Sequence, residues 1–553
     1  MSELQLLPLG GMGTVTQNMF VYEYENELLL VDCGIGFPDM QMPGVDILIP
    51  DVAYILTKLE AGKRIVGMIL THGHDDHIAA LPYLLPHLPH FPIYGSPLTV
   101  GFARQRVSEI TLEPEFHVVA EREEFRIGSH FSARGYRITH SVPDTRHYVI
   151  KTPVGLIYHG SDFKLDEHPV DGLTSDLEHI GQLKQEGVLL MMLDCLRVEY
   201  DRPVKSETTV GPVISRLMKE TKGKFVVTLM SSHIHRIQQV IEAAAEEGRR
   251  VAFIGRSVEQ NVRIAQELGQ LQYSPSMVVD KRDLDQVPDS KACLIVAGSQ
   301  GQEGSSLVRA IFGEHPVFQI KPTDTVVFSA DAIPGNELAY FAAIDQLASN
   351  GVHVLYPDVE ADLHESGHAS RVEQKQMVDL VRPEFVMPIG GADRHRFKFK
   401  EFVAEPAGYD AKHTLLPVSG EILGISASGI RVVDKITLKP PVVDGLGVGD
   451  VGPAVLSDRR NLSQAGMVVV VIPKIHGKLA VEKTEVISRG FVFMKEAEEV
   501  IDFIRDVVRE TVQQNQKTNE GDLKRAIEKR LARKLYKIIR REPLILPVIL
   551  PIS

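Results

Sequence analysis

Short apolar runs recur along the first 205 residues, and each of them ends in polar side chains. The runs at residues 27–31, 64–70 and 156–158 are followed by Asp32, by a histidine cluster and by Asp162. Runs of this length that are rich in β-branched and aliphatic residues predict β-strands. We therefore expect a sheet whose strand ends place chemically active side chains along one edge.

The hydrophobic pattern changes near residue 202, after which strand-like and helix-like runs alternate as far as residue 355. The expected strands cover residues 224–230, 250–254, 293–297 and 325–328, and the expected helix covers residues 234–247. This alternation is typical of βαβ units around a parallel sheet. Short strands and histidine-containing loops return between residues 356 and 450.

The C-terminal part has a pattern of its own. Residues 439–449 are rich in Pro, Gly and Val, which predicts a linker. Strands are expected at 467–473 and 484–488, and a helix at 522–542. That helix carries nine basic residues, and its apolar positions follow helical spacing at Leu523, Ile527, Leu531, Leu535 and Ile538. We expect it to dock on the small sheet; the alternative is that its basic face attracts RNA phosphates.

Composition and charge narrow the class of protein. The chain has 553 residues, of which 44% are apolar and 24% charged, so we expect several folded domains. Its net charge of −13 argues against a protein that coats nucleic acid over its whole surface, but it permits a local basic channel. The longest apolar run, residues 338–344, is too short to span a membrane.

Cysteine usage and the N-terminus predict a cytoplasmic protein that is not bound to a membrane. Cys33, Cys195 and Cys293 are widely separated, which argues against a disulfide framework or a thiolate zinc site. The N-terminus lacks the basic start of a secretory signal.

The strongest chemical signal is the motif HxHxDH at residues 72–77, directly after an expected strand. Imidazole and carboxylate ligands without thiolates suit zinc. The spacing lets His72 and His74 face one metal, while Asp76 and His77 begin the next helix and face a second. The alternative is a group of surface histidines in a polar turn.

Further candidate ligands stand at other expected strand ends. His140 can complete the first site, and Asp162 can bridge two metals. Asp32 would lie behind the ligands and orient them. We assign Asp76 and Asp162 to catalysis as well, through the metals that they would hold.

These residues resemble the motifs of the metallo-β-lactamase superfamily, and later segments resemble its β-CASP branch and the ribonuclease J family within it. The later segments are SSHIHR at 231–236, AGSQG at 297–301, SADAIPGNE at 329–337, HESGHAS at 364–370 and VDGLGVGDVG at 443–452. The resemblance covers essentially the whole chain. It implies an α/β fold: a metallo-β-lactamase αβ/βα sandwich with an inserted β-CASP α/β domain and a small C-terminal α/β domain.

The pattern changes and the resemblance together suggest domain boundaries. The metallo-β-lactamase domain would comprise residues 1–205 and 356–435, with the β-CASP domain at 206–355 inserted between them. Residues 436–450 would be a linker, and residues 451–553 would be the C-terminal domain. RNA would run in the cleft between the first two domains.

The resemblance implies an enzyme that hydrolyses RNA by 5′-to-3′ exonuclease and endonuclease action, in RNA decay and maturation. Two Zn²⁺ ions are expected, with Mn²⁺ or Mg²⁺ as alternatives, and the products would carry a 5′-phosphate and a 3′-hydroxyl. The substrate would be single-stranded RNA with a 5′-monophosphate. A homodimer or homotetramer is expected, with partners in an RNA-decay complex.

The resemblance also suggests residue roles around the substrate. His368 would protonate the leaving oxygen or hold the scissile phosphate; the alternative is a structural loop histidine. Ser231, Ser232 and His233 lie between an expected strand and a helix, and helix N-termini present free N–H groups to anions. Together with Ser366 and His368 from the facing domain, they would bind a terminal phosphate.

Some positions depart from the family pattern. Gly390 stands where the family has a ligand histidine, and Ala392 where it has a glutamate. The second metal would then bind weakly, use water as a ligand, or recruit Asp393 or His395. Further departures are at residues 14–18 and at His233.

Other functions stay open at this point. A small-molecule hydrolase of the same superfamily would not need the β-CASP insertion or the Ser366-Gly367-His368 sequence. A DNA nuclease of the same branch is also open, because no residue is identified as reading the 2′-hydroxyl. Gly390 motivates a third alternative, a metal-impaired paralogue that acts as an RNA-binding or assembly subunit. The intact HxHxDH motif, His140 and Asp162 argue against it.

Overall fold

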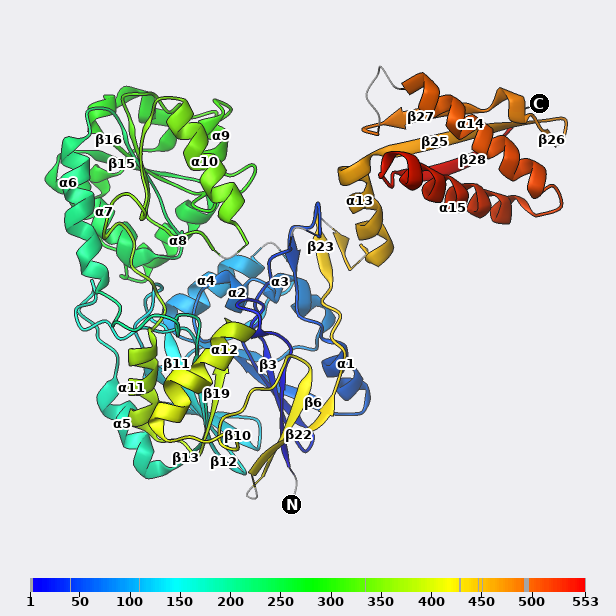
Figure 1. The fold of residues 1–553 in the computed structure, drawn as a ribbon. Coiled ribbons are helices and arrows are strands. Elements are labelled where there is room, and N and C mark those ends of the chain that lie inside the picture. Colours follow the sequence, from blue (N-terminus) through cyan, green and yellow to red (C-terminus); the bar gives the residue numbers. More distant parts are fainter. Residues whose placement is uncertain are drawn as a thin grey trace. The chain divides into compact units, whose positions relative to one another are not determined.

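The computed structural model describes residues 3–39, 41–108, 110–333, 335–426, 429–445, 447–449, 451–491 and 497–552. Three residues of the segments that carry the family resemblance, Pro334, Leu446 and Asp450, lie outside this description. The chain divides into two compact units: Met1–Phe37 with Leu48–Pro441, and Pro38–Ile47 with Val442–Ser553 (Figure 1). Among the described residues, no helix has the length and apolar character needed to cross a bilayer.

Two mixed sheets form the base of the first unit. The first has the order β22 (Gly429–Lys435), β21 (Glu421–Ser426), β1 (Leu4–Pro8), β3 (Phe20–Tyr24), β4 (Glu27–Val31), β6 (Arg64–Ile69), β7 (Pro92–Gly95) and β8 (Glu115–Val118). The second has the order β19 (Phe385–Ile389), β13 (Val188–Asp194), β12 (Gly155–His159), β11 (Arg146–Thr152), β10 (Phe131–Arg137) and β9 (Glu124–Ile127).

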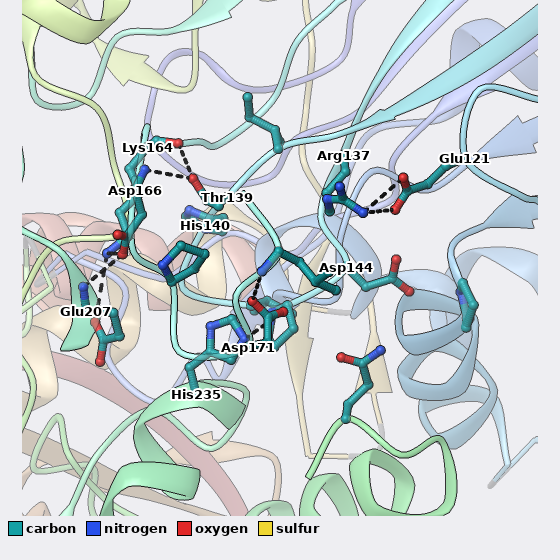
Figure 2. Close-up of a pocket in the computed structure, with 17 residues that line it drawn as sticks. Glu121, Arg137, Thr139, His140, Asp144, Lys164, Asp166, Asp171, Glu207 and His235 are labelled. Carbon is teal, nitrogen blue, oxygen red and sulfur yellow. Dashed lines mark hydrogen bonds and ion pairs between the residues drawn. The ribbon is translucent and has the colours of Figure 1, made fainter. Parts of the chain in front are cut away.

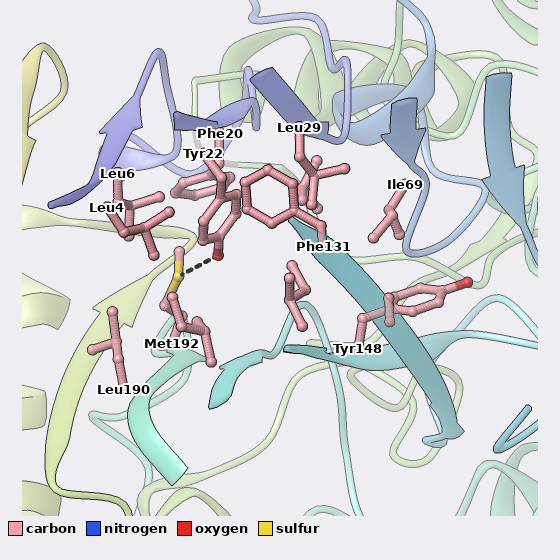
Figure 3. Close-up of a cluster of buried hydrophobic side chains, with 14 of the residues drawn as sticks. Leu4, Leu6, Phe20, Tyr22, Leu29, Ile69, Phe131, Tyr148, Leu190 and Met192 are labelled. Carbon is pink, nitrogen blue, oxygen red and sulfur yellow. Dashed lines mark hydrogen bonds between the residues drawn. The ribbon is translucent and has the colours of Figure 1, made fainter. Parts of the chain in front are cut away.

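The two sheets pack face to face through one apolar core. Leu4, Tyr22 and Leu29 enter it from the first sheet, and Phe131 and Leu190 from the second (Figure 3). Each of these side chains is at most 2% exposed. Burial of this kind, at about 25 cal/mol per Å² of apolar surface, holds the sandwich together. The strand ends that carry the candidate ligands are thereby fixed relative to one another.

Helices cover the outer faces of the sandwich. On the second sheet, α5 (Leu177–Glu186) and α11 (Arg371–Val381) bury Ile180, Leu183 and Met377 against β13 residues such as Met191. On the first sheet, α1 (Ala53–Glu60) contacts β6 and α4 (Pro97–Val107) contacts β7 and β8. The expected αβ/βα sandwich is therefore confirmed.

The inserted domain is built on a parallel sheet, as the alternating pattern predicted. Its strand order is β15 (Arg250–Ile254), β16 (Ala292–Val296), β14 (Phe225–Thr228), β17 (Thr325–Phe328) and β18 (His353–Leu355). Its helices are α6 (Val210–Glu220), α7 (Ile234–Glu246), α8 (Arg256–Glu267), α9 (Ser306–Ile311) and α10 (Glu337–Ser349). Since β13 and β19 are neighbours in the sandwich, the chain leaves after β13 and returns before β19.

The second unit contains the C-terminal segment. Its elements are α13 (Pro453–Ala465), β25 (Met467–Ile475), β26 (Lys478–Leu479), β27 (Glu485–Arg489), α14 (Ala497–Gln514), α15 (Glu520–Ile539) and β28 (Leu544–Ile552). The short strands β23 (Val442–Asp444) and β24 (Gly447–Val448) form within the stretch expected to be a linker. The domain boundaries drawn from the sequence remain predictions.

Helix α15 docks through four of its five expected apolar positions. Leu523, Ile527, Leu531 and Leu535 are buried, whereas Ile538 is 61% exposed. The helix ends at Ile539, earlier than predicted, where Arg540 adopts a left-handed φ of 54°. Ile538 therefore lies in the final turn, beyond the buried stripe.

Candidate metal centre

Loops at the ends of the sandwich strands bring the predicted metal ligands together. His72 follows β6, Asp76 and His77 lie in α2 (Asp75–Ile78), His140 follows β10 and Asp162 follows β12. The ligand atoms within each of two groups lie within 4.8 Å of one another: His72, His74, His140 and Asp162, and then Asp76, His77 and Asp162. Asp162 belongs to both groups, the position expected of a bridging ligand.

The separations within the first group fit one tetrahedral ion. His74 Nδ1 lies 3.1 Å from His72 Nε2 and 3.1 Å from His140 Nε2. Asp162 Oδ2 lies 3.7 Å from His72 Nε2 and 3.8 Å from His140 Nε2. Tetrahedral zinc with bonds of about 2.0–2.1 Å places its ligand atoms about 3.3 Å apart. Small shifts of these four side chains would suffice to surround an ion.

Outward hydrogen bonds leave the inward nitrogens without protons. His140 Nδ1 donates to the carbonyl oxygen of Gly367 at 2.6 Å. His72 Nδ1 lies 3.1 Å from Thr71 Oγ1, which donates its own proton to Asp32 at 2.8 Å. The Nε2 atoms of both buried histidines therefore carry lone pairs on the side that faces His74 Nδ1 and Asp162 Oδ2. Such a donor set fits a metal ion better than a hydrogen-bonded cluster.

The protonation states agree with this interpretation. Burial lowers the pKa of His72 and His140 well below the ordinary imidazole value, and that of His74 to about 3. Burial would raise the pKa of Asp162, but His77 and His368 lower it well below its usual range. Neutral imidazoles and an ionised carboxylate are the forms that bind metals.

In the second group, His77 Nε2 faces the carboxylates of both Asp162 and Asp76. His77 Nε2 lies 3.6 Å from Asp162 Oδ2 and 3.7 Å from Asp76 Oδ2. On the other side of the ring, His77 Nδ1 lies 2.7 Å from Asp32 Oδ2. Asp32 is 1% exposed and lies behind His77, so its carboxylate accepts the Nδ1 proton. This contact turns Nε2 toward the other two carboxylates.

The second group holds an excess of negative charge. Burial alone would lower the pKa of His77, but the carboxylates of Asp162, Asp76 and Asp32 raise it well above its usual value. Burial raises the pKa of Asp76 to about 6, and the charge of Asp162 adds to the effect. A bound cation would relieve this crowding of carboxylates.

Asp194 is a functional candidate that sequence reasoning missed. It ends β13, and its Oδ2 atom lies 2.8 Å from His368 Nδ1. His368 Nε2 in turn lies 4.0 Å from Asp162 Oδ2, so the ring faces the metal ligands. Burial would lower the pKa of His368, but Asp194 and Asp162 raise it to about 9. The signal was present: Asp194 follows an apolar run, as Asp32 and Asp162 do.

Gly390 lies beside the second group and offers it no ligand. A Cβ atom built at this position would lie 3.7 Å from the Oδ1 atoms of both Asp162 and Asp194. Asp393 and His395, which the second metal was expected to recruit in its place, belong to none of the metal-binding groups among the described residues. Asp393 pairs with Arg396 at 3.0 Å. His395 Nε2 lies 3.6 Å from a carboxylate oxygen of Glu199.

The predicted phosphate-binding residues lie directly before the N-terminus of α7 and in the loop before α11. Ser231 accepts a hydrogen bond from Asn261 at 3.2 Å, and Ser366 accepts one from the backbone N–H of His368 at 3.1 Å. Ser232 and His233 are buried. Among the described residues, His233 Nδ1 has no hydrogen-bond partner, whereas Nε2 lies 3.4 Å from a carboxylate oxygen of Glu207. Burial lowers the pKa of His233 to about 4.

A cavity of about 120 Å³ adjoins His140 (Figure 2). Its lining mixes both signs of charge and comes from the sandwich and the inserted domain. Charged residues that line it include Arg137, Asp144, Lys164, Asp166, Asp171 and Glu207. This mixed lining distinguishes the cavity from a purely basic phosphate channel.

Three family models match the chain. They are "Metallo-beta-lactamase superfamily" over residues 12–180, "Ribonuclease J, beta-CASP domain" over residues 222–347, and "Ribonuclease J C-terminal domain" over residues 454–552. A crystal structure of a protein of unknown function from Enterococcus faecalis superposes with a TM-score of 0.53 at 15% identity. It covers 76% of this chain and 100% of that chain, and it supports the fold alone.

Curated proteins match over nearly the full length. The chain is 37% identical to Ribonuclease J of Thermus thermophilus, covering 99% of this chain and 95% of that protein. It is 34% identical to Ribonuclease J of Mycolicibacterium smegmatis, with coverages of 99% and 97%. It is 32% identical to Ribonuclease J2 of Bacillus subtilis, with coverages of 99% and 99%. With its sandwich, inserted parallel-sheet domain and converging histidines and carboxylates, the chain belongs to the ribonuclease J family.

Proposed function

We propose that this protein is a metal-dependent ribonuclease that hydrolyses phosphodiester bonds of RNA. One observation carries the proposal: proton-free nitrogens of His72 and His140 converge with His74 on the Asp162 carboxylate. Family membership supplies the substrate class, since the curated relatives are named as ribonucleases. The metal-impaired alternative is not favoured, because all six metal ligands predicted from the sequence belong to the two groups.

Zinc is the proposed metal at both groups. Three imidazoles and one carboxylate form the first site, a donor set and geometry that suit Zn²⁺. Asp76, His77 and Asp162 form the second site, which has one fewer protein ligand. Mn²⁺ and Mg²⁺ favour oxygen donors and more ligands, so they are the alternatives for the second site.

The chain's own residues would organise hydrolysis around the metals. Bound metal ions would supply an activated water and neutralise charge on the attacked phosphate. Asp194 accepts the Nδ1 proton of His368 and fixes the ring with Nε2 toward Asp162. His368, whose pKa is raised to about 9, is protonated at neutral pH. It can therefore donate the Nε2 proton to the leaving 3′-oxygen.

The proposed substrate is single-stranded RNA with a 5′-monophosphate, cut both stepwise from the 5′ end and internally during RNA decay and maturation. The buried Nδ1 atom of His233, which has no hydrogen-bond partner among the described residues, supports phosphate binding by the segment that includes Ser231 and Ser232. Ser366 and His368 would contact the same phosphate from the loop before α11. Terminal phosphate binding at this place favours stepwise cutting.

A homodimer or homotetramer is proposed on the basis of the second unit. Leu546, Val548, Leu550 and Ile552 alternate along β28, and each is 38–47% exposed. Val469 and Val471 pair with Leu546 and Val548 in the same sheet. An apolar sheet face of this kind is typical of a protein–protein interface. A cytoplasmic location and partners in an RNA-decay complex are proposed from the family membership.

The test is cleavage of a 5′-labelled, 5′-monophosphorylated RNA with Zn²⁺, Mn²⁺ or a chelator. The wild type would be compared with the Asp76→Ala, His77→Ala double variant. Asp75→Ala is the matched control, because this neighbouring carboxylate pairs with Arg106 and belongs to no metal-binding group. We expect metal-dependent release of labelled mononucleotide by the wild type and the control alone.

Other outcomes of this experiment discriminate between the alternatives. Labelled fragments of intermediate length would show internal cutting. Equal cleavage of a matched single-stranded DNA would show that the protein is a general nuclease and is not specific for RNA. Retained RNA binding without cleavage under any metal would contradict the proposal and favour the metal-impaired subunit.

A further inference from the structure

Arg236 is a fully buried arginine on α7 of the inserted domain. Its Nε and Nη2 atoms each donate to one carboxylate oxygen of Glu207, both at 2.7 Å. The two side chains are 0% and 2% exposed. Nη1 also donates to the carbonyl oxygen of Ser329 at 2.7 Å. The charge is thus paired and the planar fork is fixed in one orientation.

The same guanidinium holds residues 363–368, the return loop by which the chain re-enters the sandwich. Arg236 Nη1 donates to His364 Nδ1 at 2.6 Å, and Nη2 donates to the carbonyl oxygen of Glu365 at 3.2 Å. Ser329, itself bonded to Arg236, donates through its hydroxyl to the carbonyl oxygen of Leu363 at 2.6 Å. Two consecutive residues of the loop, His364 and Glu365, are therefore bonded to this one group, and a third, Leu363, is linked to it through Ser329.

The far end of the return loop contacts the metal centre. The carbonyl oxygen of Gly367 accepts the Nδ1 proton of His140, and His368 bonds to Asp194. A Cβ atom at Gly367 would lie 2.9 Å from His140 Cε1 and 2.8 Å from Ser141 Oγ. The loop backbone therefore lies directly against a metal ligand.

The backbone of Glu207 links the Arg236–Glu207 ion pair to the sandwich. Its backbone N–H donates to Asp166 at 2.8 Å, and the backbone N–H of Asp166 donates to Thr139 Oγ1 at 3.0 Å (Figure 2). Thr139 Oγ1 donates to the carbonyl oxygen of Lys164 at 2.6 Å. Thr139 precedes His140, and Lys164 follows Asp162 by two residues. The segments that carry both ligands are thus linked to the ion pair.

We propose that Arg236 is a positioning residue for the metal centre. Paired with Glu207, it holds the return loop so that Gly367 orients His140 and His368 faces Asp162. The inserted domain would in this way set the geometry of a metal site whose ligands all belong to the sandwich. The catalytic part of this proposal rests on the proposed ribonuclease function, whereas its metal-binding part does not.

The test compares Arg236→Lys with Arg249→Lys in the full chain. Lysine keeps the charge but cannot reproduce the fork that bonds Glu207 and the return loop together. Arg249 is the matched control: it is 5% exposed, lies in the same domain and donates to four backbone carbonyls. These carbonyls belong to Gly223, Ala292, Met218 and Thr221, all outside the return loop. Readouts are thermal stability, Co²⁺ absorption and affinity, and kcat and KM on RNA.

We expect both variants to lose stability, but Arg236→Lys alone to change the metal centre. Its Co²⁺ absorption bands would shift and its Co²⁺ affinity would fall by about 10-fold, because partners behind the ligands typically contribute 10- to 100-fold. Its kcat would fall by about 10- to 100-fold, with KM changed by less than about threefold. Identical Co²⁺ spectra and equal kcat values in the two lysine variants would overturn the proposal.

A second variant covers the case in which Arg236→Lys does not fold. His364→Ala removes one bond between Arg236 and the return loop but leaves the ion pair with Glu207 intact. We expect a smaller shift of the Co²⁺ spectrum in the same direction, and an unchanged spectrum would contradict the proposal. If the wild type cleaves no RNA, the proposed function fails, and the Co²⁺ comparison alone still decides the role of Arg236.

Discussion

His77 Nδ1 lies 2.7 Å from Asp32 Oδ2, and this contact determines which nitrogen of His77 faces the second metal group. The carboxylate of Asp32 also accepts the backbone N–H and the hydroxyl proton of Thr71, each at 2.8 Å. Through these three contacts, Asp32 holds the start of the HxHxDH loop in place. It also keeps the proton of His77 on Nδ1, so that Nε2 is left to bind a metal. Partners of this kind raise the basicity of a metal-binding histidine.

Replacing Asp32 by Asn should therefore weaken the second metal site. The amide donor would oppose the Nδ1 proton of His77 and favour the wrong tautomer. We expect zinc affinity at the weaker site to fall by about 10- to 100-fold. Calorimetric zinc titration measures it, with Asp324→Asn as control, because Asp324 is equally buried but accepts from Lys224 and Lys321 in the inserted domain. Equal zinc affinities in the two variants would contradict the role of Asp32.

Gly390→His should tighten the second site. A side chain there would start 3.7 Å from Asp162 Oδ1, close enough to add a ligand. Gly390 has a φ of 66°, so any other residue would cost about 1–3 kcal/mol of stability in the metal-free protein. Gly390→Ala is the control, because it carries the same strain without a ligand. Zinc binding should be at least about 10-fold tighter in the histidine variant than in the alanine variant.

Asp194 and His368 should control proton donation. His368→Ala is expected to lower kcat by about 10²- to 10⁴-fold while both metals remain bound. The imidazolium is the active form, so activity should fall as the pH rises through its pKa, at or below about 9. Asp194→Asn removes a negative charge that stabilises the imidazolium, which lowers this pKa and moves the alkaline limb to lower pH.

A pH–rate profile of each variant provides the measurement for Asp194. The control is Asp410→Asn, which alters a surface pair of the same type, Asp410 with His413 at 2.7 Å. If the rate of Asp194→Asn falls at the same alkaline pH as the rate of the wild type, His368 is not the proton donor.

Buried histidines outside the metal groups should make the fold sensitive to acid. Burial lowers the pKa of His147 to about 3, against about 6.5 in the unfolded chain. Between these two values the unfolded state binds more protons, so stability is lost as the pH falls below 6.5. From pH 7.5 to 5.5 the protonation of this one group in the unfolded chain should lower the stability by about 1.4 kcal/mol.

The effect of His147 is measurable by urea unfolding of wild type and His147→Gln at both pH values. The variant loses the hydrogen bonds to Tyr158 and to the carbonyl oxygen of Ser161, so it should be less stable at both. Its loss of stability between pH 7.5 and 5.5 should nevertheless be smaller than that of the wild type. Equal losses would show that His147 does not contribute to the acid sensitivity.

Local patterns predicted the elements that carry the chemistry. The runs before Asp32, His72 and Asp162 form β4, β6 and β12, because their apolar residues are those that the sandwich core buries. The alternating segment forms the parallel sheet, and the stripe from Leu523 to Leu535 docks α15. Helix ends were predicted less accurately, as Ile538 shows, because the end of a buried stripe depends on what the helix packs against.

The sequence by itself determined the ligand types, the strand ends that carry them and the family. Only the tertiary structure decided which of them meet: it placed Asp194 on His368, Gly367 on His140, and Arg236 on the return loop. Asp393 and His395 were candidate ligands because they are close to Gly390 in the sequence, but they pair with Arg396 and Glu199. The reason is physical: ligand type and strand ends follow from local patterns, whereas partners more than a hundred residues apart are selected by packing between sheets and domains.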